Sequence, residues 1–203
     1  MTGLTLNGQI GSERGDVFLS SAGAGGMNKL TANDALVDSL HQTAWNFTFL
    51  TVEFYSSGYG VGFNTKNGAV NATTGGPGVT TYISNGSPWL QINNGSNSDG
   101  SGNLVSYPAN TLVIRADGSR YNSNTSRDFV SYLNGTYNSA NYTTNLVPAT
   151  TAATRKIAYG TVSDGSAYMA SGRRLYGLAL FNTMLTQAQL DAIRASFQRR
   201  WSV

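Results

Sequence analysis

Short runs of apolar or alternating residues recur through the middle of the chain, between residues 45 and 183. Clusters of Gly, Asn, Ser and Asp separate these runs at the spacing that is typical of strands in a β-sandwich. Residues 47–55 form the clearest strand, because aromatic and β-branched side chains alternate between two faces. We expect further strands at residues 60–63, 79–83, 89–92, 111–115, 128–133, 156–159 and 174–181.

Tight turns are predicted where Asn or Asp precedes Gly, because such pairs adopt the positive φ angles that hairpins need. Two segments, 71–78 and 93–103, have the composition of loops, and the second is nearly free of apolar side chains. The predicted turns begin at Asn67, Asn85, Asn94, Asp117, Asn134 and Asp164.

The two ends of the chain differ from this middle part. Near the C-terminus Thr186 and Gln189 have capping-box spacing, and apolar residues follow at near-helical intervals, which predicts a short helix. Residues 1–40 are less regular, and we interpret them as an arm or as the first strands, with residues 41–203 forming the domain. The apolar positions of the predicted helix are Leu190, Ile193, Phe197 and Trp201.

The composition excludes several classes of function. Only 11% of the residues are charged, against about a quarter in an average protein, and the chain has no cysteine. The net charge is +3 and no long Lys/Arg run occurs, so we expect no nucleic acid partner. No signal-peptide pattern and no long apolar stretch is present, so we expect neither Sec export nor a membrane anchor. Four arginines near the end are interpreted as solvated or interface residues: Arg173, Arg174, Arg199 and Arg200.

The order of elements over residues 112–190 is similar to that of a known superfamily. A strand leads to Asp117-Gly118, a second strand leads to Asn134-Gly135, and a Gly-bearing strand ends in Phe181-Asn182 before Leu185-Thr186 and the helix. This order resembles the laminin G-like, concanavalin A-like jelly-roll superfamily. The resemblance implies an all-β sandwich of two antiparallel sheets with a short C-terminal helix. It also implies a curved face or rim loops that bind glycans, in some members with calcium.

Glycoside hydrolysis needs two carboxyl groups at a fixed separation. Members of the superfamily that cleave β-glucans carry a Glu-x-Asp-x-x-Glu strand, whereas this chain has only two glutamates, Glu13 and Glu53. The nearest acidic pairs are Glu13 with Asp16 and Asp34 with Asp38, and we interpret them as surface charges. The single histidine, His41, has no cysteine or nucleophile motif to act with and is interpreted as structural. We therefore expect no enzymatic activity.

A sugar-binding patch is predicted around the long loop. Sugar sites combine an aromatic platform with amide and carboxylate groups, and Trp89, Tyr107, Asn93 and Asp99 lie close together in the sequence. Trp89 fits the core of the sandwich equally well. No cofactor is required, although calcium takes oxygen ligands of the kind present in Asn93, Asn94, Asp99, Asp117 and Asp164, which are also ordinary turn residues.

Three functions remain for this sequence. The first is a non-catalytic surface or structural protein of a bacteriophage particle, either a capsid decoration or a fibre, exposed on the virion and docked to other virion proteins through residues 1–40. The second is a soluble carbohydrate-binding lectin module, and the third is a hydrolase. The small polar composition and the predicted lack of a leader favour the first. A homo-oligomer, with three chains as the expectation from the resemblance, is compatible with the first two.

Overall fold

The structure of the chain is a computed structural model, in which the strands form two sheets. It describes residues 4–6, 9–13, 16–20, 28–30, 40, 46–56, 60–65, 76–84, 86–102, 104–143, 146–149, 158–159 and 173–201. His41, Asp34, Asp38 and the predicted turn residues Asn67, Asn85 and Asp164 lie outside the described residues. For residues 4–6, 9–13, 16–20, 28–30 and 158–159 the backbone alone is described.

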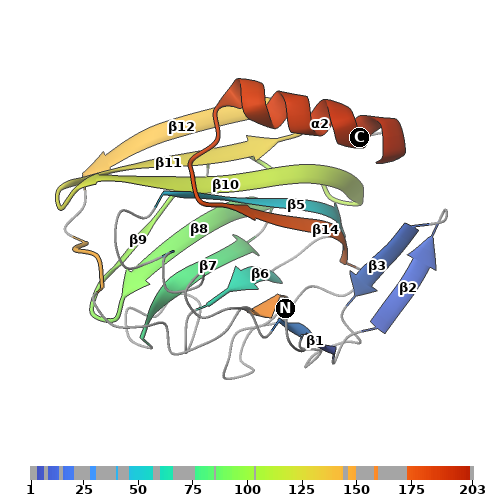
Figure 1. Cartoon of the computed structure of the whole chain (residues 1–203), viewed down its shortest axis with the longest axis horizontal. Helices are drawn as coiled ribbons and strands as arrows, with labels where there is room; N and C mark the ends of the chain where they lie inside the picture. Colours follow the sequence, from blue (N-terminus) through green and yellow to red (C-terminus); the bar gives the residue numbers. More distant parts are fainter. Residues whose placement is uncertain are drawn as a thin grey trace.

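Two seven-stranded antiparallel sheets stack face to face, and one helix covers the outside of the upper sheet in Figure 1. This arrangement confirms the predicted two-sheet antiparallel sandwich with a short C-terminal helix. Sheet A has the order β1 (Leu4–Leu6), β4 (Asn28–Leu30), β13 (Ala158–Tyr159), β6 (Gly60–Asn64), β7 (Pro77–Ser84), β8 (Ser87–Asn94) and β9 (Ser98–Gly100). Sheet B has the order β12 (Thr136–Thr143), β11 (Ser126–Leu133), β10 (Thr111–Ser123), β5 (Phe47–Tyr55), β14 (Arg174–Phe181), β3 (Asp16–Ser20) and β2 (Gln9–Glu13).

Strand β5 lies in the middle of sheet B and is buried on both faces, as its continuous aromatic and β-branched sequence requires. Its alternation separates two cores. Phe47 and Phe49 point between the sheets into a cluster with Phe63, Leu90 and other apolar residues. Leu50 and Val52 point to the outer face of sheet B and pack beneath the helix.

The helix α2 (Gln187–Trp201) closes this outer face (Figure 1). Its first turn has the predicted capping box, because the Thr186 N–H donates to Gln189 Oε1 at 2.9 Å and the Gln189 N–H donates to Thr186 Oγ1 at 3.4 Å. Leu190 is fully buried against sheet B, with Leu185 buried and Ile193 partly buried beside it. Among the described residues, no helix is long and apolar enough to span a membrane.

The turn predictions have a mixed outcome. Asn134 (φ 49°) and Gly135 (φ 102°) form the two-residue loop between β11 and β12, as predicted. Asn94 and Gly95 open the turn between β8 and β9. The prediction of a turn at Asp117 is wrong, because this residue lies inside the continuous strand β10.

Gly118 allows a close approach inside β10 instead of making a turn. A side-chain carbon on this residue would lie 3.1 Å from the carbonyl oxygen of Phe47 and 3.3 Å from Met184 Cγ. The glycine therefore lets β10 approach the neighbouring strand and the segment before α2. Its partner in the sequence pair, Asp117, is held in the strand by a buried ion pair with Arg115.

Three segments form strands where the sequence predicted loops or no element. Residues 93–103, predicted as one loop, contain the end of β8 and the short strand β9, and Pro77 and Gly78 belong to β7. Strand β12 was missed, because its sequence is almost wholly polar and it lies at the edge of sheet B with both faces partly exposed.

Residues from the N-terminal 40 add strands to both sheets. β1 and β4 belong to sheet A, where β4 pairs with β13. β2 and β3 belong to sheet B, where β3 pairs with β14. Glu13 and Asp16 lie opposite each other at the end of the β2–β3 pair. The docking role of this segment stays a prediction.

Gly62 in β6 gives a first test of the packing between the sheets. A Cβ atom there would lie 2.5 Å from Thr81 Oγ1, whose position is fixed by the bond that it accepts from the Phe63 N–H at 2.9 Å. We expect Gly62→Ala to lower the free energy of unfolding by about 1–3 kcal/mol through overpacking. Urea unfolding measures the change. Gly177→Ala is the control, since its Cβ would meet Val52 at an ordinary 3.7 Å and should cost less than about 0.5 kcal/mol.

Candidate binding face

The four residues predicted to form a sugar-binding patch do not share one surface, because some lie on the outer face of sheet A and others between the two sheets. Trp89 lies on β8 with its side chain on the outer face, opposite the fully buried Leu90. Asp99 on β9 pairs with Ile92, so its side chain lies on the inner side of the sheet. Tyr107 is buried between the sheets, and Asn93 is buried at the end of β8.

The outer face of sheet A carries an aromatic pair. Tyr82 on β7 and Trp89 on β8 are direct cross-strand partners, and their rings lie parallel, with centroids 5.9 Å apart and planes 6° apart. Val61 on β6 pairs with Tyr82 and extends the row. Tyr82 is 6% exposed and Trp89 is partly exposed, so the indole is the accessible end of the row.

A row of amide and hydroxyl groups lies beside the aromatic row, two residues away on β7 and β8 and three residues away on β6, where the register shifts. Asn64, Thr80 and Gln91 are consecutive cross-strand partners on this outer face, and the Thr80 hydroxyl donates to Asn64 Oδ1 at 2.7 Å. The Gln91 amide donates to the Ser98 hydroxyl at 3.3 Å. Gln91 Oε1 is buried without a hydrogen-bond partner among the described residues, which leaves one acceptor to be satisfied.

The absence of a side chain at Gly100 leaves room for the indole of Trp89. Gly100 is the cross-strand partner of Gln91, and a side-chain carbon on it would lie 3.6 Å from Trp89 Cε3. The edge strand β9 therefore approaches the indole with backbone only. The outer face of sheet A thus combines a flat aromatic surface with the adjacent, partly exposed Gln91 amide, which is the chemistry that recognises a sugar ring and its hydroxyls.

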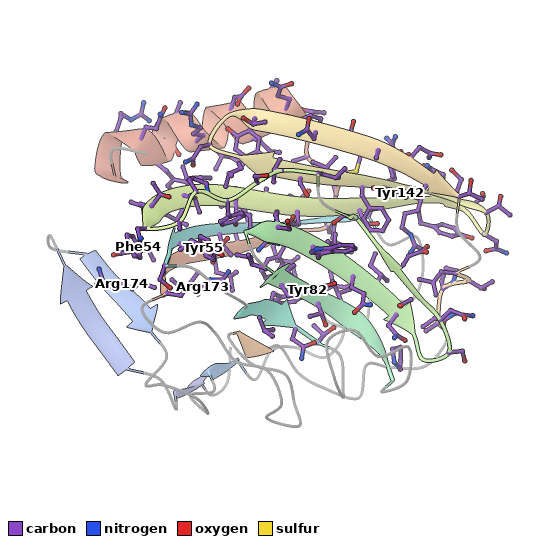
Figure 2. All side chains as sticks on the ribbon, turned by 180° about the vertical axis from the view of Figure 1, so that it is seen from behind. Phe54, Tyr55, Tyr82, Tyr142, Arg173 and Arg174 are labelled. Atoms are coloured by element: carbon purple, nitrogen blue, oxygen red, sulfur yellow. The ribbon has the colours of Figure 1, made fainter. Side chains whose placement is uncertain are left out.

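The inner faces hold a buried ion pair that the sequence did not predict. Arg173 is 1% exposed and its Nε and Nη2 donate to Glu53 Oε2 at 3.1 and 2.6 Å. The Tyr107 hydroxyl donates to Glu53 Oε1 at 3.0 Å, and burial raises the pKa of Tyr107 well above its ordinary value. Figure 2 labels Arg173 between the sheets, in contrast to Tyr82 on sheet A.

The interpretation of Arg173 as a solvated or interface residue is therefore wrong. Its guanidinium is buried because Glu53, also buried, needs a partner of opposite charge in the low-dielectric interior. Arg174 lies partly buried over the ring of Phe54, 5.3 Å from its centroid (Figure 2). Arg199 is exposed, as expected. The side chain of Arg200 is not among those that the structure describes.

A second ion pair fills the same interior. Arg115 and Asp117 are both buried and bonded to each other, and the Ser131 hydroxyl donates to Asp117 Oδ1 at 3.1 Å. Burial raises the pKa of Asp117, and Arg115 acts against this shift. Arg115 also lies 5.5 Å from the Tyr107 ring centroid, so both pairs meet at this tyrosine. These groups stabilise the sandwich and have no access to a ligand.

Asp99 forms an ion pair with Arg127, which connects sheet A to sheet B. It lies 3.5 Å from the fully buried Arg127, which also donates to the Leu146 carbonyl oxygen at 3.4 Å. Burial raises the pKa of Asp99, with Arg127 opposing, and burial lowers the pKa of Arg127 to about 10. Asn93 Oδ1 accepts the Gly95 N–H at 2.6 Å and so shapes the β8–β9 turn. Asp99 and Asn93 have structural contacts of their own.

The carboxyl groups whose side chains are described all have protein partners. Asp128 accepts from Arg120 and Asn141, and Asp191 accepts from the Tyr132 hydroxyl at 2.9 Å. Glu53, Asp99 and Asp117 are paired with arginines as described above. Within this described part, no three acidic or histidine side chains gather as a metal site would require. The Asn94 Oδ1, proposed as a calcium ligand, accepts the Ser96 and Asn97 N–H groups.

Comparison with solved structures gives the fold of this chain. The binding domain of botulinum neurotoxin DC, solved with rat synaptotagmin II, matches 97% of this chain and 47% of that chain at a TM-score of 0.67 and 13% identity. The botulinum neurotoxin serotype C1 binding domain matches at 0.64 and 12% identity over the same shares. These likenesses show the fold alone. The chain spans about half the length of these binding domains.

A third solved structure has a different activity. Trypanosoma rangeli sialidase, solved with sialic acid, matches 97% of this chain and 33% of that chain at a TM-score of 0.58 and 12% identity. No family model and no curated protein sequence matches the chain. The sequence predicted Trp89 as a platform but missed Tyr82, whose place beside it depends on the register of β7 and β8.

Proposed function

We propose that this chain is a non-catalytic glycan-binding domain that binds sugar on the outer face of sheet A. The parallel stack of Tyr82 and Trp89 carries this proposal. A partly exposed indole, held flat by a second ring, offers a rigid apolar surface to one face of a sugar ring. The neighbouring amide of Gln91, which is partly exposed, supplies the hydrogen-bonding chemistry that orients hydroxyl groups.

The solved structures of similar fold support a sugar as the ligand class. The botulinum neurotoxin DC binding domain has been solved in complex with SialylT, and cell entry of botulinum neurotoxin type C depends on interaction with two ganglioside molecules. A jelly roll of this kind presents sheet faces and rim loops to ligands, but fold alone does not determine the ligand. Sialylated and ganglioside-type glycans are therefore the first set to test.

Hydrolysis is the weaker alternative. The sialidase match concerns an enzyme, but the described carboxyl groups of this chain are buried or bonded to arginine, tyrosine or asparagine. A glycosidase needs one carboxylic acid and one carboxylate facing the same sugar. Release of sugar from any bound glycan by the purified chain would contradict a purely binding role.

A glycan array with the purified chain, run once with calcium and once with chelator, tests the proposal. We expect selective binding to a small group of related glycans. Binding that disappears with the chelator would assign a role to calcium, whereas equal binding in both buffers would assign recognition to the protein groups alone. An array on which no glycan binds above background would contradict the proposal.

Trp89→Ala should weaken the binding of an array hit at least about tenfold, because it removes the accessible ring of the stack. Tyr107→Phe is the matched control, since its hydroxyl bonds to Glu53 between the sheets. Calorimetric titration measures both variants. Equal affinities of Trp89→Ala and the parent chain would place the site elsewhere, and a loss with Tyr107→Phe would point to a global disturbance.

We further propose that this domain is exposed on a bacteriophage particle. The support is its composition, which is rich in small polar residues, has 11% charged residues and lacks cysteine. Since β3 and β4 pair with strands of the main sheets, docking through residues 1–40 has to be tested by substitution and not by deletion. Immunogold labelling of intact particles tests the location, and labelling confined to particle-free protein would contradict it.

A further inference from the structure

Strand β12 is the end strand of sheet B. Among the described residues it pairs with β11 alone, and its position at the end of the sheet is visible in Figure 1. Edge strands carry unpaired N–H and C=O groups, and proteins usually protect them with Lys, Pro, a bulge or short length. β12 has eight residues, none charged and none Pro or Gly, and no register shift interrupts its ladder. The edge of sheet A differs, because β9 has only three residues and one of them is Asp99.

The β11–β12 hairpin determines which backbone groups face the free edge. Its two-residue loop has positive φ at both positions, 49° and 102°, so Leu133 and Thr136 form the hydrogen-bonded pair that closes the turn. Alternate residues along an antiparallel strand bond to the same neighbour. The groups facing away from β11 therefore belong to Tyr137, Ser139, Asn141 and Thr143.

We propose that β12 pairs antiparallel with β12 of a second copy of this chain, which joins two copies of sheet B into one continuous sheet. A two-fold axis at Ala140 would place Ser139 opposite Asn141 of the partner subunit and Tyr137 opposite Thr143 of the partner subunit. Each outward group then finds a partner. Such a pairing is self-complementary and closes at two chains.

The side chains of β12 suit this pairing with an identical strand. At the axis Ala140 would face its own copy in a non-hydrogen-bonded pair, where side chains approach most closely, and alanine is small enough for that position. Because the strand has no charge, two copies would not repel each other across the edge. Asn141 and Asn138 bond to Asp128 and to the Leu104 carbonyl oxygen of their own chain, which pre-orders the strand before association.

The solution mass of the full chain tests the pairing. Light scattering after size exclusion should give twice 21.5 kDa for the parent chain and 21.5 kDa for Ser139→Lys and Ser139→Pro. Ser139 is exposed and its N–H does not bond to β11, so both variants should keep the parent circular dichroism spectrum and melting temperature. Gln198→Lys, which adds the same charge on an exposed position of α2, is the control and should remain a dimer.

Three results would overturn the inference. They are a parent chain that stays at 21.5 kDa at its highest soluble concentration, a mass of three chains, and Ser139 variants that fold and still form dimers. The test does not involve the glycan-binding face, because β12 belongs to sheet B and the Tyr82–Trp89 pair to sheet A. Failure of one proposal therefore leaves the other in place.

Discussion

Arg173→Met should lower the free energy of unfolding by about 3–5 kcal/mol, the range for breaking a buried ion pair by removing one partner. The variant removes the guanidinium that donates two hydrogen bonds to the fully buried Glu53 carboxylate. Urea or guanidinium unfolding followed by fluorescence measures the change. Arg174→Met is the matched control, because this neighbour is only partly buried, and it should cost less than about 1 kcal/mol.

The double variant Glu53→Gln/Arg173→Met separates the charge from the packing. The glutamine keeps an oxygen acceptor for Tyr107, and no isolated charge remains in the interior. We expect the double variant to recover a large part of the loss caused by Arg173→Met. If Arg173→Met alone costs less than about 1 kcal/mol, the pair is more accessible to water than its burial indicates.

Leu190→Ala should destabilise the domain by about 2–5 kcal/mol, because it leaves a cavity between α2 and sheet B. Leu190 is fully buried and packs in the same cluster as Leu50, Ile114 and Val130 from three strands. Gln198→Ala, on an exposed position of the same helix, is the control and should stay within about 0.5 kcal/mol of the parent chain. Equal melting temperatures for the two variants would show that α2 does not stabilise the sandwich.

The strands with a strong local signal could be predicted from the sequence. Residues 47–55 alternate large apolar side chains, and the capping box at Thr186 is encoded within four residues, so both predictions agree with the structure. β12 has no apolar alternation and becomes a strand only because β11 offers it a ladder across the Asn134–Gly135 turn. Local propensity could not reveal that dependence on a neighbour.

The interior charges could not be predicted, for a similar reason. Glu53 and Arg173 are 120 residues apart in sequence and meet because β14 begins next to β5. Seen alone, Arg173 belongs to an arginine cluster near the C-terminus, which favours an exposed position. Trp89, Asp99 and Tyr107 illustrate the opposite error, because closeness in sequence suggested one patch. Strand alternation places Asp99 on the inner side of sheet A, and Tyr107 is buried between the sheets.

The glycan site is tested most directly by mapping a bound oligosaccharide onto the isotope-labelled chain. Amide chemical shifts would be followed by NMR while an array hit is titrated to saturation. We expect the saturable shifts to gather on β6, β7 and β8 around Tyr82, Trp89 and Gln91. Shifts confined to the β8–β9 turn or to α2, with these amides unmoved at saturation, would contradict it.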